Sequence, residues 1–97
     1  MPNGGNWDRF CFVLQGFRAA HGSWPTQVRS PQRILAEFEL RLGPADWRKV
    51  CSRIEFVADD MVGFVAADAE GRDYTYCGPA AAIDIRAEEW LGVSMPH

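Results

Sequence analysis

Hydrophobic positions in the first half of the chain recur with the period of an α-helix. Near the N-terminus one stripe, at i, i+3, i+4, i+7 and i+10, consists of Trp7, Phe10, Cys11, Leu14 and Phe17. It predicts a first helix over residues 7–21, capped by Asn6 and ended by Gly22. The stripe of the second helix is Ile34, Leu35, Phe38 and Leu42. We expect this helix to begin at Ser30-Pro31, with Ser30 as the cap, and to end at Gly43.

A third helix is predicted from Pro44, because Trp47, Val50, Cys51 and Ile54 repeat at the same spacing. Its opposite arc holds only cationic and polar residues, namely Arg48, Lys49, Ser52 and Arg53. After Ile54 the period shortens to two, which indicates strands over 53–58, 61–67 and 72–77. The second and third runs predict a hairpin whose turn ends at Gly71. A short final helix, capped by Asp84, would extend through Leu91.

This order of elements predicts an α+β fold in a single domain over residues 1–97, with a flexible arm at 1–6 and a tail at 92–97. We expect three N-terminal helices, with a short extended piece at 26–29, followed by a three-stranded antiparallel meander and the short C-terminal helix. A winged-helix domain has the same order of elements, and its helix before the hairpin enters the major groove of DNA.

Composition and charge narrow the class of protein. Of the 97 residues, 47% are hydrophobic and 24% are charged, which is typical of a globular domain and excludes disorder, collagen and coiled coil. The net charge of −3 is unevenly divided: residues 24–53 hold six cations against three carboxylates, and residues 54–97 hold two cations against nine. Acidic residues in the hairpin would repel phosphates, which weighs against nucleic acid as the partner.

Residues that could carry chemistry are few and scattered. The three cysteines, Cys11, Cys51 and Cys77, lie far apart, and His21 is the interior histidine. We therefore expect buried, reduced thiols in the cytoplasm, folding without a metal, a cofactor or an intramolecular disulfide, and no enzymatic activity. The acidic run before Gly71 places its glycine too early for a calcium loop and predicts a turn instead.

Three segments carry a resemblance to other proteins. They are Trp24-Pro25-Thr26-x-Val28-Arg29, Phe64-Val65-Ala66-x-Asp68-x-x-Gly71-Arg72-x-Tyr74-x-Tyr76 and Ala87-Glu88-Glu89-Trp90-Leu91. Together they are similar to short bacterial proteins of unassigned function. The resemblance spans most of the chain and implies a bacterial or phage-borne cytosolic protein, without implying an activity or a site.

The sequence favours a small intracellular, non-catalytic module that binds another protein as an adaptor, regulator or inhibitor. The alternative is a winged-helix-like regulator that binds nucleic acid through helix 44–53. The candidate interaction residues are Trp24, Arg29, Arg48, Lys49, Arg53, Tyr74 and Tyr76. Two roles stay open for Trp24, an exposed anchor or a plug that closes the core over the first helix. The cations of the third helix either bind a partner or keep the helix solvated.

Overall fold

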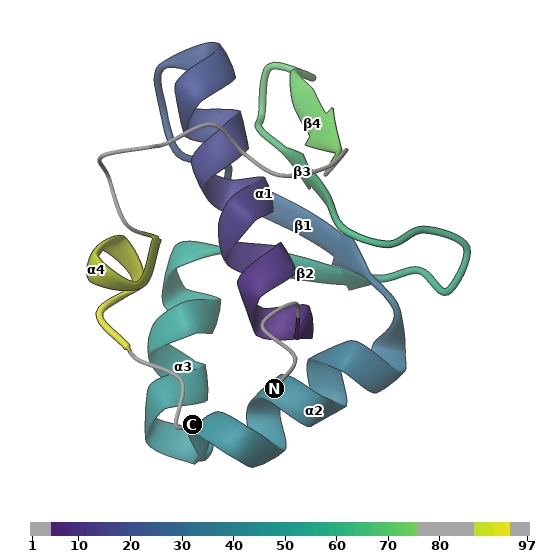
Figure 1. Ribbon diagram of the computed structural model, residues 1–97, viewed down its shortest axis with the longest axis vertical. Helices are drawn as coiled ribbons and strands as arrows, with labels where there is room; N and C mark the ends of the chain where they lie inside the picture. Colours follow the sequence, from purple (N-terminus) through teal and green to yellow (C-terminus); the bar gives the residue numbers. More distant parts are fainter. Residues whose placement is uncertain (1–4, 76–86, 94–97) are drawn as a thin grey trace.

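The computed structural model describes residues 5–75 and 87–93 of the chain. Its elements, in chain order, are α1 (Asn6–His21), β1 (Gln27–Ser30), α2 (Gln32–Leu42), α3 (Pro44–Arg53), β2 (Glu55–Ala58), β3 (Val65–Ala67), β4 (Asp73–Thr75) and α4 (Ala87–Leu91). Helix α1 crosses the strands, α2 contacts its N-terminal half, and α3 packs against α2 and β2 (Figure 1). The predicted α+β class is confirmed.

The four strands form one mixed sheet in the order β2-β1-β3-β4. Strand β1 pairs in parallel with β2, with Gln27 opposite Glu55, and antiparallel with β3. The predicted antiparallel meander is therefore wrong. Residues 27–30, expected as an extended piece outside the meander, form a central strand because their alternate side chains Val28 and Ser30 are fully buried. A parallel pair needs a long crossover connection, and α2 and α3 together provide it.

This topology also departs from a winged-helix domain. Strands β2 and β3 would flank the wing in that fold, but here β1 lies between them. The hairpin that does form is β3–β4, in which Val65 lies opposite Thr75 and Ala67 opposite Asp73. Gly71, with φ of 84°, lies in its turn, so the predicted hairpin and its glycine are confirmed.

An aromatic cluster forms the centre of the hydrophobic core. Phe10 is fully buried, and its ring centroid lies 5.1 Å from that of Trp7, 5.5 Å from Phe38, 5.7 Å from Phe56 and 5.9 Å from Phe64. Aromatic pairs at such separations stabilise a fold by about 0.5–1.5 kcal/mol each beyond the area they bury. The stripe predicted for the first helix thus faces the core and fixes α1 against both α2 and the sheet.

The sheet has a core face and an outer face, because strand side chains alternate. Val28 and Ala66 lie opposite each other on the core face and are fully buried. The register puts a second set on the outer face, consisting of Gln27, Arg29, Glu55, Val57, Val65, Ala67, Asp73 and Thr75. The charged members of this set are all exposed.

Glycines end the first two helices as predicted. Gly22 follows α1 in the left-handed conformation, with φ of 83°, and its amide donates to the Arg18 carbonyl over 2.8 Å. Gly43, with φ of 87°, separates α2 from α3, and Pro44 begins α3. These positive φ values are readily adopted only by glycine, so the helix ends are set locally by the sequence.

The side-chain caps predicted at Asn6 and Ser30 are wrong. Helix α1 begins at Asn6, with Gly5 at the N-cap, and the Asn6 side-chain amide donates instead to Glu37 Oε1 over 3.3 Å. Ser30 ends β1, where its carbonyl accepts from the Asp59 amide, so Pro31 takes the cap position of α2. Strand pairing therefore removes Ser30 from the cap role.

The C-terminal helix α4 packs beside α1. The amide of Ala87 donates to Gln15 Oε1 over 3.0 Å, and Trp7 Nε1 donates to Glu88 Oε2 over 2.8 Å. The predicted cap, Asp84, lies outside the described residues. Within the described segments, no helix has both the length and the apolar character needed to cross a membrane.

Candidate functional site

The cations predicted on the third helix lie on the outward side of α3. Arg48, Lys49 and Arg53 are all exposed. Lys49 Nζ is 3.8 Å from Asp46 Oδ1, so this cation already has a carboxylate neighbour. A shallow hollow of about 310 Å³ is lined by Lys49, Ser52, Arg53, Leu91 and Gly92.

Trp24 stacks on Trp90, an aromatic residue of α4 that was not among the candidate interaction residues. The two ring planes are 7° apart with centroids separated by 4.6 Å, and both side chains pack against the core. The Arg53 guanidinium lies 5.9 Å from the centre of the Trp90 ring. The structure thus brings Trp24 and Arg53 together through Trp90. Because the stack covers one face of the Trp24 ring, the geometry favours the plug role over the exposed anchor.

Arg29 lies apart from the other candidates, on the outer face of the sheet. Val57 and Val65 flank it in the register, and the neighbouring row places Glu55 and Asp73 on the same face. One cation beside two carboxylates creates no positive field of the kind that attracts nucleic acid.

Tyr74 packs inward rather than offering an exposed ring. It is half-buried against the core, and its ring occupies the space that a Cβ at Gly16 would fill. Gly16 is therefore a packing position that the sequence analysis missed, and its only signal was a glycine inside a helical pattern. Tyr76 lies outside the described residues.

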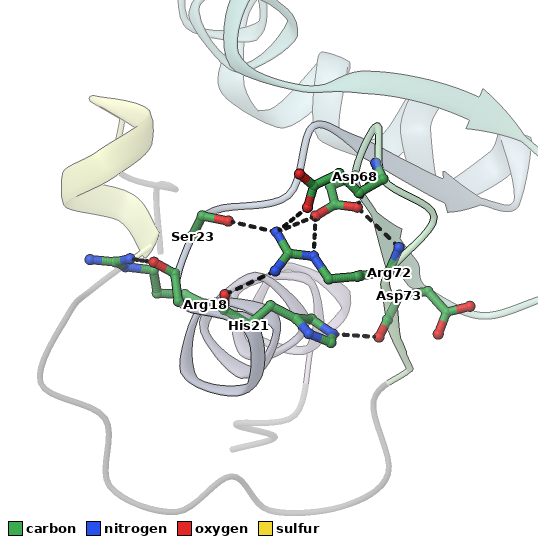
Figure 2. Close-up of polar contacts among 8 residues, drawn as sticks. Arg18, His21, Ser23, Asp68, Arg72 and Asp73 are labelled. Carbon is green, nitrogen blue, oxygen red and sulfur yellow. Dashed lines mark hydrogen bonds and ion pairs between the residues drawn. The ribbon is translucent and has the colours of Figure 1, made fainter.

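Arg72 fastens the β3–β4 turn to the C-terminal end of α1 (Figure 2). Its Nη2 is 2.7 Å from Asp68 Oδ2 and 3.1 Å from Glu70 Oε1. The same guanidinium donates to the His21 carbonyl over 3.3 Å and to Ser23 Oγ over 3.4 Å. We call this group the Arg72 clasp, comprising His21, Ser23, Asp68, Glu70 and Arg72. The N–H groups of the Arg72 guanidinium thus donate to other residues of the protein rather than standing free for a ligand.

Asp68 is the acceptor at the centre of this clasp. Its Oδ1 accepts from the backbone amides of Glu70 and Arg72, both over 3.0 Å. Burial raises the pKa of Asp68, but the hydrogen bonds from the Arg72 side chain and from these two amides outweigh it and hold the pKa below its usual value. The acidic run is thus organised as a turn, as the sequence predicted.

His21 also takes part in holding the end of α1. Its Nε2 donates to the Asp73 carbonyl over 2.9 Å, and its ring lies 4.6 Å from that of Phe17. The hydrogen bond joins the end of α1 to β4 (Figure 2), and the ring contact lies within α1.

The described cysteines are free thiols in different environments. Cys11 is half-buried, and burial, with smaller contributions from Glu88 and Asp8, raises its thiol pKa. Cys51 is exposed, contrary to the expectation that it is buried, because Val50 is the buried residue of α3 and Ile54 is buried just after the helix ends. Partial burial of its sulfur, and to a smaller extent the negative charge of Glu39, nevertheless raise the pKa of the Cys51 thiol. A raised pKa disfavours the thiolate, which is the nucleophilic form of cysteine. Cys77 lies outside the described residues.

A cleft of about 400 Å³ opens between the first turns of α1 and α2 and the loop that joins β2 to β3. Arg9 and Arg33 line it from the two helices, and both side chains are exposed. Neither guanidinium has an ion pair or hydrogen bond within residues 5–75 and 87–93. The lining also includes the buried residues Ile34 and Phe64. We call this the arginine cleft.

The loop beside the arginine cleft is shaped by two neighbouring aspartates. Asp59 Oδ1 accepts from the Met61 amide over 3.0 Å. Asp60 Oδ1 accepts from the Gln32 amide over 3.0 Å, which supplies α2 with the side-chain acceptor that its N-terminus would otherwise lack. Met61 projects from this loop and is 91% exposed.

The residues of the cleft were not among the sequence-based candidates. Arg9 and Arg33 occupy ordinary solvent positions on their helices, and no local pattern marks them. Their proximity arises only when α1, α2 and the β2–β3 loop pack together. The sequence feature that could have indicated this cleft was Met61 next to Asp59 and Asp60, and a single methionine in a polar loop is a weak indication of a binding site.

No cluster of three or more His, Cys, Asp or Glu side chains among the described residues is arranged to hold a metal ion. Comparisons with protein-family models, curated proteins and solved structures found no match to this chain.

Proposed function

We propose that the protein acts by binding another protein, and that the arginine cleft is the binding site. The observation that carries this proposal is the pair Arg9 and Arg33. Two guanidinium groups without a partner in the described structure stand beside the apolar surface of Met61 in one hollow. Arginine and methionine are enriched at protein interfaces. Arginine forms directional hydrogen bonds that orient the partner, and the flexible methionine side chain provides apolar surface that can change shape to fit it.

The scaffold around the cleft is held before any partner arrives. Helix α1 is tied to α2 by the Phe10 and Phe38 rings and by the hydrogen bond from Asn6 to Glu37. The β2–β3 loop is held by the hydrogen bonds of Asp59 and Asp60. A preformed site loses little conformational entropy on binding, which favours affinity.

This role requires no chemistry from the protein itself, and we propose a cytoplasmic adaptor, regulator or inhibitor. The thiols of Cys11 and Cys51 have raised pKa values, and the Nε2 of His21 donates to a backbone carbonyl. Such groups are poor candidates for a nucleophile or a general base.

Nucleic-acid binding through α3 is the second candidate. The exposed side chain of Arg48 and the hollow lined by Lys49 and Arg53 favour it. Against it, β2 and β3 do not pair to form a wing beside α3. We expect duplex DNA to bind no more tightly than about 10 μM at physiological salt, the usual non-specific level. Sub-micromolar, sequence-selective binding would put this candidate first.

The test is affinity purification of the full chain from a lysate of its native host. Three baits are compared: the wild type, the cleft variant Arg9→Gln/Arg33→Gln, and the matched control Arg48→Gln/Arg53→Gln. We expect a discrete protein to be retained by the wild type and the control and to be lost by the cleft variant. Retention of nucleic acid that only the control variant loses would contradict the proposal.

A further inference from the structure

We propose that the arginine cleft recognises a peptide segment of its partner in which an aspartate or glutamate lies next to a large apolar side chain. This inference rests on the proposed function, since it names the chemistry of the segment that occupies the same cleft.

The charge of the cleft calls for an anion. Its lining holds two cations, Arg9 and Arg33, and one carboxylate, Asp60. Asp60 is already an acceptor for the Gln32 amide, and the Asn6 side chain already donates to Glu37. The two guanidinium groups are therefore the charged donors of the lining that have no acceptor among the described residues, and a carboxylate accepts from such groups in charge-assisted, often bidentate, hydrogen bonds.

The apolar part of the lining calls for a hydrophobic side chain beside that carboxylate. Ile34 and Phe64 are buried at the cleft, and Val62 is half-buried there. Met61 is 91% exposed although the Asp59 hydrogen bond holds its backbone in place. An unbranched thioether can adapt its shape to a leucine, phenylalanine or methionine of the partner.

A peptide fits this lining better than a nucleic acid does. Single-stranded nucleic acids bind through aromatic rings on which bases stack. The aromatic ring in the lining belongs to Phe64, which is only 6% exposed and is engaged with Phe10 and Phe38 in the core. The cleft therefore offers guanidinium groups for charge but no free ring for a base.

The size of the cleft limits the motif. A volume of about 400 Å³ accommodates a few side chains. An extended chain advances roughly 3.3 Å per residue, so we expect the carboxylate and the apolar side chain to lie within two residues of each other.

The experiment begins with selection of short random peptides displayed on phage, using the full-length protein as bait. We expect enriched sequences to share an acidic residue beside Leu, Phe or Met. One enriched peptide is then synthesised with a fluorescent label, together with a version in which its acid is replaced by the amide. Fluorescence anisotropy measures the affinity of both peptides for the protein.

We expect Arg9→Gln/Arg33→Gln to weaken binding by about thirtyfold or more and the amide peptide to weaken it by about tenfold. The control Arg48→Gln/Arg53→Gln should bind within about twofold of the wild type. Arg9→Lys/Arg33→Lys retains the charge but loses the planar fork, so an intermediate loss is expected. If Arg9→Gln/Arg33→Gln fails to fold, the loss of affinity in Arg9→Lys/Arg33→Lys still tests the proposal.

The place of binding is checked with methionine methyl labels. The Met61 resonance, identified by its disappearance in Met61→Leu, should shift when the peptide is added. A random single-stranded RNA is titrated in parallel, and RNA that displaces the peptide in an Arg9- and Arg33-dependent way would overturn the choice of a peptide.

The outcomes separate this inference from the function on which it rests. Peptides that lack an acidic residue but still shift Met61 would overturn the acidic-apolar motif while leaving protein binding at the cleft intact. Peptides that depend on Arg48 and Arg53, or the absence of any enriched peptide, would contradict both.

Discussion

The two ends of α1 place arginine side chains in opposite situations. At the C-terminal end, the Arg72 guanidinium contacts two carboxylates, a backbone carbonyl and a hydroxyl (Figure 2). At the N-terminal end, Arg9 and Arg33 line a cleft and have no ion pair within the described residues. An arginine whose donors are filled belongs to the fold, whereas one whose donors stand free beside apolar surface is available to a ligand. Substitutions at the two ends should therefore affect different properties.

The largest effect on stability is expected where the hairpin presses against α1. Gly16→Ala should lower the free energy of unfolding by about 1–3 kcal/mol, because the new methyl group overlaps the Tyr74 ring. Chemical denaturation measures this loss.

The same substitution in a Tyr74→Leu background is the control. Leucine lacks the ring atoms that the methyl group meets, so Gly16→Ala should there stabilise the protein by up to about 1 kcal/mol through helix propensity. Stabilisation by Gly16→Ala in both backgrounds would show that Tyr74 does not pack on this glycine.

A second effect should appear in how the stability that the Arg72 clasp contributes depends on pH. Because the pKa of Asp68 is lowered in the folded protein, its contribution to stability is fully present above the unfolded value of about 3.9 and is lost as the pH falls through the folded pKa. Melting temperatures of the wild type should decline more steeply below about pH 4 than those of Asp68→Asn. Parallel curves for the two proteins would contradict this role of Asp68.

The smallest effect on stability is expected at the arginine cleft. Arg9→Gln/Arg33→Gln should change the free energy of unfolding by no more than about 0.5 kcal/mol, because both side chains are exposed and unpartnered in the described structure. Arg72→Gln, in contrast, should lower the melting temperature clearly. A larger loss from the cleft variant than from Arg72→Gln would reverse the comparison between the two ends.

The sequence could predict the parts of this fold that depend on local chemistry. The helices over Asn6–His21, Gln32–Leu42 and Pro44–Arg53 follow from helical spacing and from Gly22, Gly43 and Pro44. The hairpin turn at Gly71 is equally local. Strand partners were not predictable in this way, because placing β1 between β2 and β3 depends on how the α2–α3 crossover packs against the core.

The candidate site was less accessible to sequence analysis than the fold. Helical periodicity correctly placed Arg48, Lys49 and Arg53 in solvent, but it could not show that Trp24 stacks on Trp90. The arginine cleft combines residues from Asn6 to Phe64, and no spacing rule connects positions so distant in the chain. Sites of this kind appear only when tertiary packing is known.

The central claim is that the arginines of the cleft receive a ligand while the arginine of the clasp does not. Side-chain ¹⁵N spectra of the full chain, recorded with and without the selected acidic peptide, test it most directly. We predict that the Arg9 and Arg33 guanidinium signals shift and become protected from exchange with water, while the Arg72 signal stays unchanged. Unchanged Arg9 and Arg33 signals with saturating peptide, or a shift confined to Arg72, would contradict the account.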